Sequence, residues 1–101
     1  HGPTPGFAEK LLGLFARRGV DLVLNGHDHV YSRSKPVGGV RYLVTGGGGA
    51  LLNGCRAAIG IVRCESRYHF LYLVIGEDSV RVKAVPASGR PFDRLEIPFN
   101  P

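Results

Sequence analysis

Large apolar residues near the start of the chain recur at helical spacing. They would share one face of a helix, with charged residues falling largely elsewhere: Phe7, Leu11, Leu12 and Phe15. Thr4-Pro5 suits the beginning of a helix, because Thr caps a helix and Pro is accepted at its first position. Gly19 follows two arginines and is placed to end it. The pattern predicts one amphipathic helix over about residues 5 to 18.

After this helix, the pattern changes to that of short β-strands. The apolar run at 20–24 predicts a buried strand that ends at Asn25-Gly26. Residues 27–36 are polar and mixed, which predicts a loop that passes into a short strand. Gly38-Gly39 precedes another strand at 40–45, so we expect a hairpin with a two-residue turn.

Three apolar runs near the end of the chain predict an antiparallel meander. Residues 68–75 are rich in aromatic and β-branched side chains, which favour strands. Residues 79–85 and 94–99 each alternate apolar with polar positions, as half-buried strands do. Residues 50–67 are the least regular, with a short strand suggested at 59–62.

Length and composition allow one small globular domain. The chain has 101 residues, of which 44% are hydrophobic and 21% are charged. No apolar run is long enough to cross a bilayer. The chain starts at His1 and contains no Met, so we expect a fragment of a longer protein.

The net charge of +5 is spread along the chain. The chain contains no run of five basic residues and no interleaving of basic with aromatic residues. Nucleic-acid binding is therefore the less favoured explanation of the positive charge. Cys55 and Cys64 are too few for a disulfide framework. Two partly buried thiols, or one disulfide in an exported protein, remain open.

The candidate chemistry lies in Gly26-His27-Asp28-His29, directly after a predicted strand. In extended chain His27 and His29 project to the same side, where their imidazoles could converge on one metal or on two adjacent metals. Asp28 would point away; it could cap the turn or hold a ligating imidazole through a hydrogen bond. An exposed turn with two histidines would also explain this motif.

Residues 20–33 together resemble the last motif block of the calcineurin-like metallophosphoesterases, where a helix and a strand lead into a G-H-x-H loop. Val30-Tyr31-Ser32-Arg33 resembles the x-Y-x-R extension of that loop in the purple acid phosphatases. Other segments also resemble this family in order and spacing: residues 1–3, 40–50, 68–71 and 89–93. The resemblance covers nearly the whole chain.

The resemblance implies an α/β fold, a four-layer α/β/β/α sandwich. Residues 1–101 would be the C-terminal part of one phosphoesterase domain, contributing one helix and about six strands. The missing N-terminal part of that domain would be its partner. Without it, we expect one sheet face and one sheet edge to lack a covering layer.

The resemblance also implies two divalent or trivalent metal ions, iron, zinc or manganese, that hydrolyse phosphate esters. His27 would bind one metal together with His1, and His29 would bind the other. Tyr31 and Arg33 are candidates to orient the substrate phosphate, since Arg presents a planar fork to oxyanions. They could equally pack and pair on the strand surface.

The chain departs from the family by lacking its D-x-H, G-D-x-x-D or G-D-x-x-Y, and G-N-H blocks. The expected acid catalyst, the histidine of G-N-H, is therefore missing. Three neutral imidazoles cannot offset the charge of two adjacent cations. We expect no catalytic residue in this chain and predict that it is inactive alone.

Three other features have alternative interpretations. A structural zinc module could use His27, His29, Cys55 and Cys64. The Gly46–Gly49 run lacks the Lys-Ser/Thr of a phosphate-binding P-loop, so a close-packed loop beside the metal cavity is favoured. His69 lies in a predicted strand and is expected to be structural rather than a metal ligand.

Overall fold

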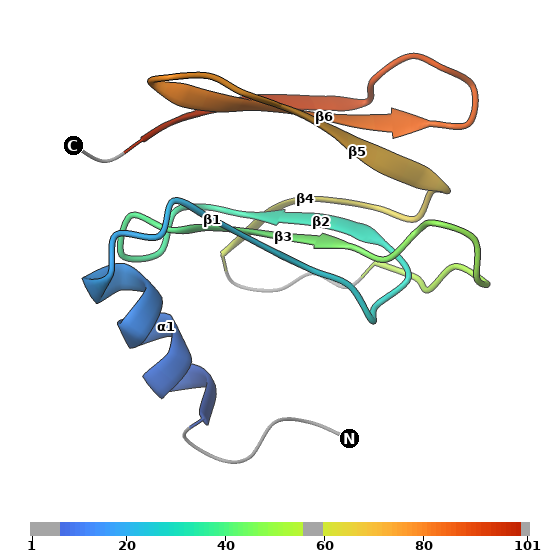
Figure 1. The fold of residues 1–101 in the computed structure, drawn as a ribbon. Coiled ribbons are helices and arrows are strands. Elements are labelled where there is room, and N and C mark those ends of the chain that lie inside the picture. The colour runs from blue at the N-terminus through green and yellow to red at the C-terminus, as the bar shows by residue number, and fades with distance from the viewer. Residues whose placement is uncertain (1–6, 56–59, 100–101) are drawn as a thin grey trace.

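The computed structural model describes residues 7–55 and 60–99, which form one helix and two sheets in three layers (Figure 1). The elements are α1 Phe7–Arg17, β1 Leu22–Asn25, β2 Tyr31–Ser34, β3 Arg41–Thr45, β4 Ile61–Glu65, β5 His69–Ile75, β6 Ser79–Pro86 and β7 Asp93–Pro98. The predicted helix is confirmed over 7–17, and its expected first residues lie outside the described range. Within that range no helix is long and apolar enough to cross a membrane.

The first sheet has the strand order β1-β3-β2-β4. β1 runs parallel to β3, and β2 is antiparallel to both β3 and β4. The predicted hairpin joins β2 to β3: Val37 and Val40 exchange backbone hydrogen bonds of 2.8 and 3.0 Å. Gly38 and Gly39 between them have φ angles of 58° and 79°, which glycine adopts at least cost.

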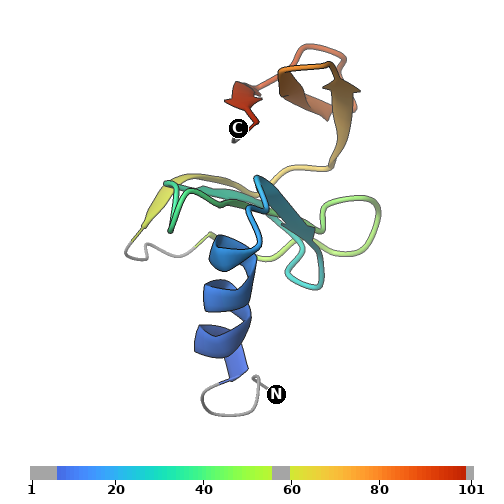
Figure 2. The ribbon, with the colours of Figure 1, turned by 60° about the vertical axis from the view of Figure 1, so that its left-hand side comes forward.

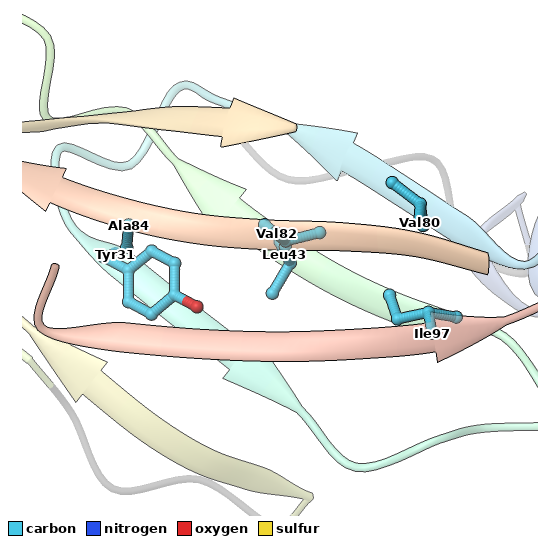
Figure 3. Packing of buried hydrophobic residues seen from close by; sticks show 6 residues of the cluster. All are labelled: Tyr31, Leu43, Val80, Val82, Ala84 and Ile97. Carbon is cyan, nitrogen blue, oxygen red and sulfur yellow. The ribbon is translucent and has the colours of Figure 1, made fainter. Parts of the chain in front are cut away.

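The second sheet is the predicted antiparallel meander, in the order β5-β6-β7. It lies on one side of the first sheet, and α1 lies on the other (Figures 1 and 2). β6 shows the predicted alternation, with its apolar side chains Val80, Val82 and Ala84 buried. These side chains meet Tyr31 and Leu43 of the first sheet, which are fully buried, to form the core (Figure 3).

Two sequence predictions were inaccurate in this region. The strand suggested at 59–62 is β4 at Ile61–Glu65, and residue 59 lies outside the described range. The first strand is not fully buried, because β1 is an edge strand and Leu24 is 43% exposed. The seven strands described agree with the expected number of about six.

The outward face of β5 carries a row of exposed apolar side chains. Phe70, Tyr72 and Val74 are 56%, 54% and 46% exposed, because alternation along the strand turns them away from the core. No described element covers this face (Figure 1). An uncovered sheet face of this kind is what we expect from the resemblance. That another layer of the whole domain covers it remains a proposal.

Candidate metal centre

The loop after β1 is folded into two consecutive three-residue turns. The Asp28 N–H donates to the Gly26 carbonyl over 3.0 Å, and the Val30 N–H donates to the Asp28 carbonyl over 2.9 Å. His27, at the centre of the first turn, has a φ of 78°. A γ-turn of this hand is rare and strained for a residue other than glycine. Such strain concentrates at functional sites, so this geometry makes His27 a functional candidate.

Variants of His27 test this strain directly. We expect His27→Gly to be more stable than His27→Ala by about 1 kcal/mol, because only glycine adopts a positive φ without steric cost. Both variants remove the imidazole, so its contacts cancel in the comparison. Chemical denaturation of the two proteins measures the difference. An alanine variant at least as stable as the glycine variant would show that the backbone is not strained at this position.

His29 is held on its backbone and on its ring. Its N–H donates to Oδ1 of Asn53 over 2.7 Å, and its carbonyl accepts from the Asn53 N–H over 3.0 Å. Nδ1 of the ring lies 2.7 Å from the Leu51 carbonyl oxygen. A carbonyl only accepts, so Nδ1 carries a proton, and in the neutral ring Nε2 then keeps its lone pair. This is the tautomer that a histidine needs in order to bind a metal through Nε2.

Gly46 and Gly47 fit closely against two histidine-bearing segments. The Gly46 N–H donates to the Val30 carbonyl over 3.1 Å, and a Cβ on Gly46 would overlap the carbonyl oxygen of Asp28. A Cβ on Gly47 would lie 2.5 Å from Nδ1 of His69. The predicted close packing of the glycine run is thus confirmed at Gly46 and Gly47, whereas a Cβ at Gly48 or Gly49 would meet nothing within 4 Å.

His69 is buried, and both of its ring nitrogens have partners within the protein. Nδ1 lies 2.8 Å from the Arg67 carbonyl oxygen, and Nε2 lies 2.8 Å from the Thr45 hydroxyl. Nδ1–H therefore donates to the carbonyl, and Nε2 accepts from Thr45. The structural role expected for His69 is confirmed, although it is the first residue of its strand.

Tyr31 and Arg33 point from β2 toward the second sheet and meet Asp93 of β7. The Tyr31 hydroxyl donates to Oδ2 of Asp93 over 2.5 Å, and Arg33 donates from Nε over 2.8 Å and from a terminal nitrogen over 3.3 Å. The two side chains therefore pack and pair, as the second interpretation has it, but between the two sheets rather than on a strand surface. A further role toward a substrate phosphate remains a prediction.

The charges of this cluster stabilise one another. Burial alone would raise the pKa of Asp93, but hydrogen bonds from Arg33 and Tyr31 outweigh it and lower that pKa. Burial, followed by the Asp93 carboxylate, raises the pKa of the Tyr31 phenol. The hydrogen bond to Asp93 likewise raises the pKa of Arg33. At neutral pH the cluster thus contains a carboxylate, a guanidinium and a neutral phenol.

Cys55 and Cys64 form a disulfide, with Cα atoms 5.9 Å apart. The interpretation as two thiols is therefore wrong, and that of a single disulfide is confirmed. Disulfide sulfurs are not the thiolates that zinc binds, so the ligand set of His27, His29 and two cysteines is not assembled. The disulfide instead fastens the segment 51–55 to β4, beside a cavity of about 730 Å³.

Only some of the predicted metal ligands lie among the described residues. His27 and His29 lie in one loop, exposed and half-buried respectively, and His1 lies outside the described residues. Asp28 lines the cavity, while the ring of His29 bonds to Leu51, so a supporting role for Asp28 remains a prediction. Within 7–55 and 60–99, no three His, Cys, Asp or Glu side chains gather as a metal site. Imidazole suits zinc, iron, copper and nickel alike, so these two histidines do not select one metal.

Similarity to known proteins extends over the whole chain. No family model matches it. It is 29% identical to tartrate-resistant acid phosphatase type 5 of Rattus norvegicus over 110 residues, covering all of this chain and 34% of that protein. The Homo sapiens protein of the same name is 28% identical over 107 residues, covering 97% and 33%. The chain is thus similar to these acid phosphatases from end to end. The chain spans about a third of their length.

A solved structure shares the fold. The structure titled "GAP50 the anchor in the inner membrane complex of Plasmodium" superposes with a TM-score of 0.84 at 18% sequence identity. The match covers 97% of this chain and 31% of the other. At this identity the likeness establishes the arrangement of helix and sheets, and function has to be argued from the site.

Proposed function

We propose that this chain is part of a metal-dependent phosphatase that hydrolyses phosphate esters at a binuclear centre. His27 and His29 would be ligands, with His1 joining His27. The observation that carries the proposal is the ring of His29, whose Nδ1 is occupied by the Leu51 carbonyl so that Nε2 is available to a metal. The acid phosphatase homologues support the same reaction.

The chain's own residues would bind and orient rather than transfer protons. When bound, the metal pair would supply a hydroxide nucleophile and neutralise the phosphoryl oxygens. Nε2 of His29 would donate its lone pair, while the Leu51 carbonyl keeps the ring from rotating. Carboxylate ligands and the acid catalyst would come from the rest of the full-length protein. Imidazoles from this chain together with carboxylates from the rest of the protein would suit iron, zinc and manganese.

Metal removal tests the proposed function in the full-length protein. We expect hydrolysis of p-nitrophenyl phosphate to be lost after dialysis against a chelator and to return with added iron, zinc or manganese. Residues 1–101 alone should stay inactive with the same metals, because their histidines lack the carboxylate ligands. Hydrolysis that survives complete metal removal would overturn the proposal, as would activity of the isolated chain.

A further inference from the structure

We propose that Asn53 is a positioning residue for His29 and that the Cys55–Cys64 disulfide keeps Asn53 in place. The inference rests on the proposed function, since it assumes that His29 binds a metal. Asn53 itself touches neither metal nor substrate in this scheme. It acts through the orientation of the histidine.

The first step concerns the backbone of His29. Asn53 contacts both peptide groups that flank this residue. Its side-chain Oδ1 accepts from the His29 N–H over 2.7 Å, and its backbone N–H donates to the His29 carbonyl over 3.0 Å. These two hydrogen bonds, one accepted and one donated by Asn53, fix the position and the rotation of the two peptide groups around His29. The direction of the Cα–Cβ bond of His29 is thereby set by Asn53.

The second step concerns the ring. The carbonyl that binds Nδ1 belongs to Leu51, two residues before Asn53 on the same segment. The segment 51–55 therefore holds His29 at its N–H, its carbonyl and its imidazole at once. Because the three contacts come from Leu51 and Asn53, two residues of one short segment, displacement of the segment would disturb all of them together.

The third step asks what holds the segment itself. It forms neither helix nor strand, and the Leu51 side chain is 85% exposed, so apolar burial contributes little. Two links attach it to the end of β4: the Ser66 hydroxyl donates to the Asn53 carbonyl over 2.6 Å, and Cys55 is bonded to Cys64. The disulfide is the covalent link among these anchors. We infer that it serves the metal ligand by restraining Asn53.

Zn²⁺ binding to the full-length protein tests the inference. Groups that orient a metal-binding histidine typically change metal affinity by about 10- to 100-fold when removed, and we expect this loss for Asn53→Ala. Asn53→Asp should restore most of the affinity, because its side chain still offers an oxygen to the His29 N–H. Val62→Ala is the control and should bind normally, since Val62 lies on β4, is 55% exposed and supplies none of the contacts that hold His29 in this scheme.

A second readout separates positioning from general damage. Nitrogen-15 spectra of the histidine rings should show His29 protonated at Nδ1 in the metal-free protein and a mixture of tautomers in Asn53→Ala. The double variant Cys55→Ser/Cys64→Ser should weaken Zn²⁺ binding in the same direction. Adding Asn53→Ala to it should cause little further loss, because the bond from the His29 N–H to Oδ1 of Asn53 is already released when the segment is no longer anchored.

The outcomes distinguish the two proposals. If the unaltered protein binds none of zinc, iron and manganese, the proposed function fails. If it binds Zn²⁺ and Asn53→Ala binds equally well, the metal centre stands and the positioning role of Asn53 is wrong. If the cysteine and asparagine variants lower affinity additively, Asn53 acts without the disulfide and the second half of the inference is overturned.

Discussion

Replacing Gly46 with alanine should lower phosphate-ester hydrolysis by the full-length protein about 100-fold or more. The added Cβ would overlap the carbonyl oxygen of Asp28 and lie 2.8 Å from its carbonyl carbon. Both atoms belong to the backbone and cannot rotate away, so the loop between His27 and His29 has to move. A displacement of about 1 Å at a catalytic centre commonly costs two orders of magnitude in rate.

Gly48→Ala is the matched control within the same glycine run. A Cβ at Gly48 meets nothing within 4 Å, and Gly48 is not among the glycines with positive φ. Its hydrolysis rate should therefore stay close to that of the unaltered protein. The rate of hydrolysis and the amount of bound metal, measured for both variants, test this prediction. If Gly46→Ala retains full activity, the glycine loop does not position the histidines.

Replacing Asp93 with alanine should destabilise the folded protein by about 3 kcal/mol, the range found when one partner of a buried ion pair is removed. Asp93 is 7% exposed and accepts hydrogen bonds from Tyr31 and Arg33. Without the carboxylate, a buried phenol and a partly buried guanidinium lose their partner between the two sheets. The free energy of unfolding in urea measures the loss.

Glu96→Ala provides the comparison on the same strand. Glu96 pairs with Arg81 at 3.7 Å, and their side chains are 54% and 71% exposed. An ion pair this exposed is worth less than about 1 kcal/mol, because water and salt screen it. Equal effects of Asp93→Ala and Glu96→Ala would mean that the Asp93 cluster does not hold the sheets together.

The lowered pKa of Asp93 also fixes how this contribution depends on pH. A carboxyl group with a lower pKa in the folded state adds stability that is fully present above its unfolded pKa, about 3.9. That stability is lost as the pH falls through the lower pKa of the folded state. The unaltered protein and Asp93→Ala should therefore differ most near neutral pH and converge in acid below about pH 4.

Features set by neighbouring residues were predictable from the sequence. Alternation at Val80, Val82 and Ala84 gives the buried face of β6, because a strand repeats every two residues. Gly38-Gly39 gives the hairpin, because few other pairs accept two positive φ angles in succession. The G-H-x-H motif marks His27 and His29 as candidate ligands from the sequence alone, and their binding of a metal remains a prediction.

Features set by distant residues were not predictable. Tyr31 and Asp93 are 62 positions apart, and His29 and Asn53 are 24 apart, so no local spacing links them. The exposure of Leu24 was not predicted, because an apolar run has the same pattern in an edge strand as in a central strand. The strain at His27 left no signal in the sequence, since only the backbone angle reveals it.

The distance along the chain between Tyr31 and Asp93 has a consequence for protein synthesis. Every contact described for the loop of His27 and His29 uses residues up to 66, so this loop can form early as the chain leaves the ribosome. Tyr31 and Arg33 acquire their carboxylate only when residue 93 has been made. Because chains fold from the N-terminus during translation, the two sheets would join after the loop of His27 and His29 has taken shape.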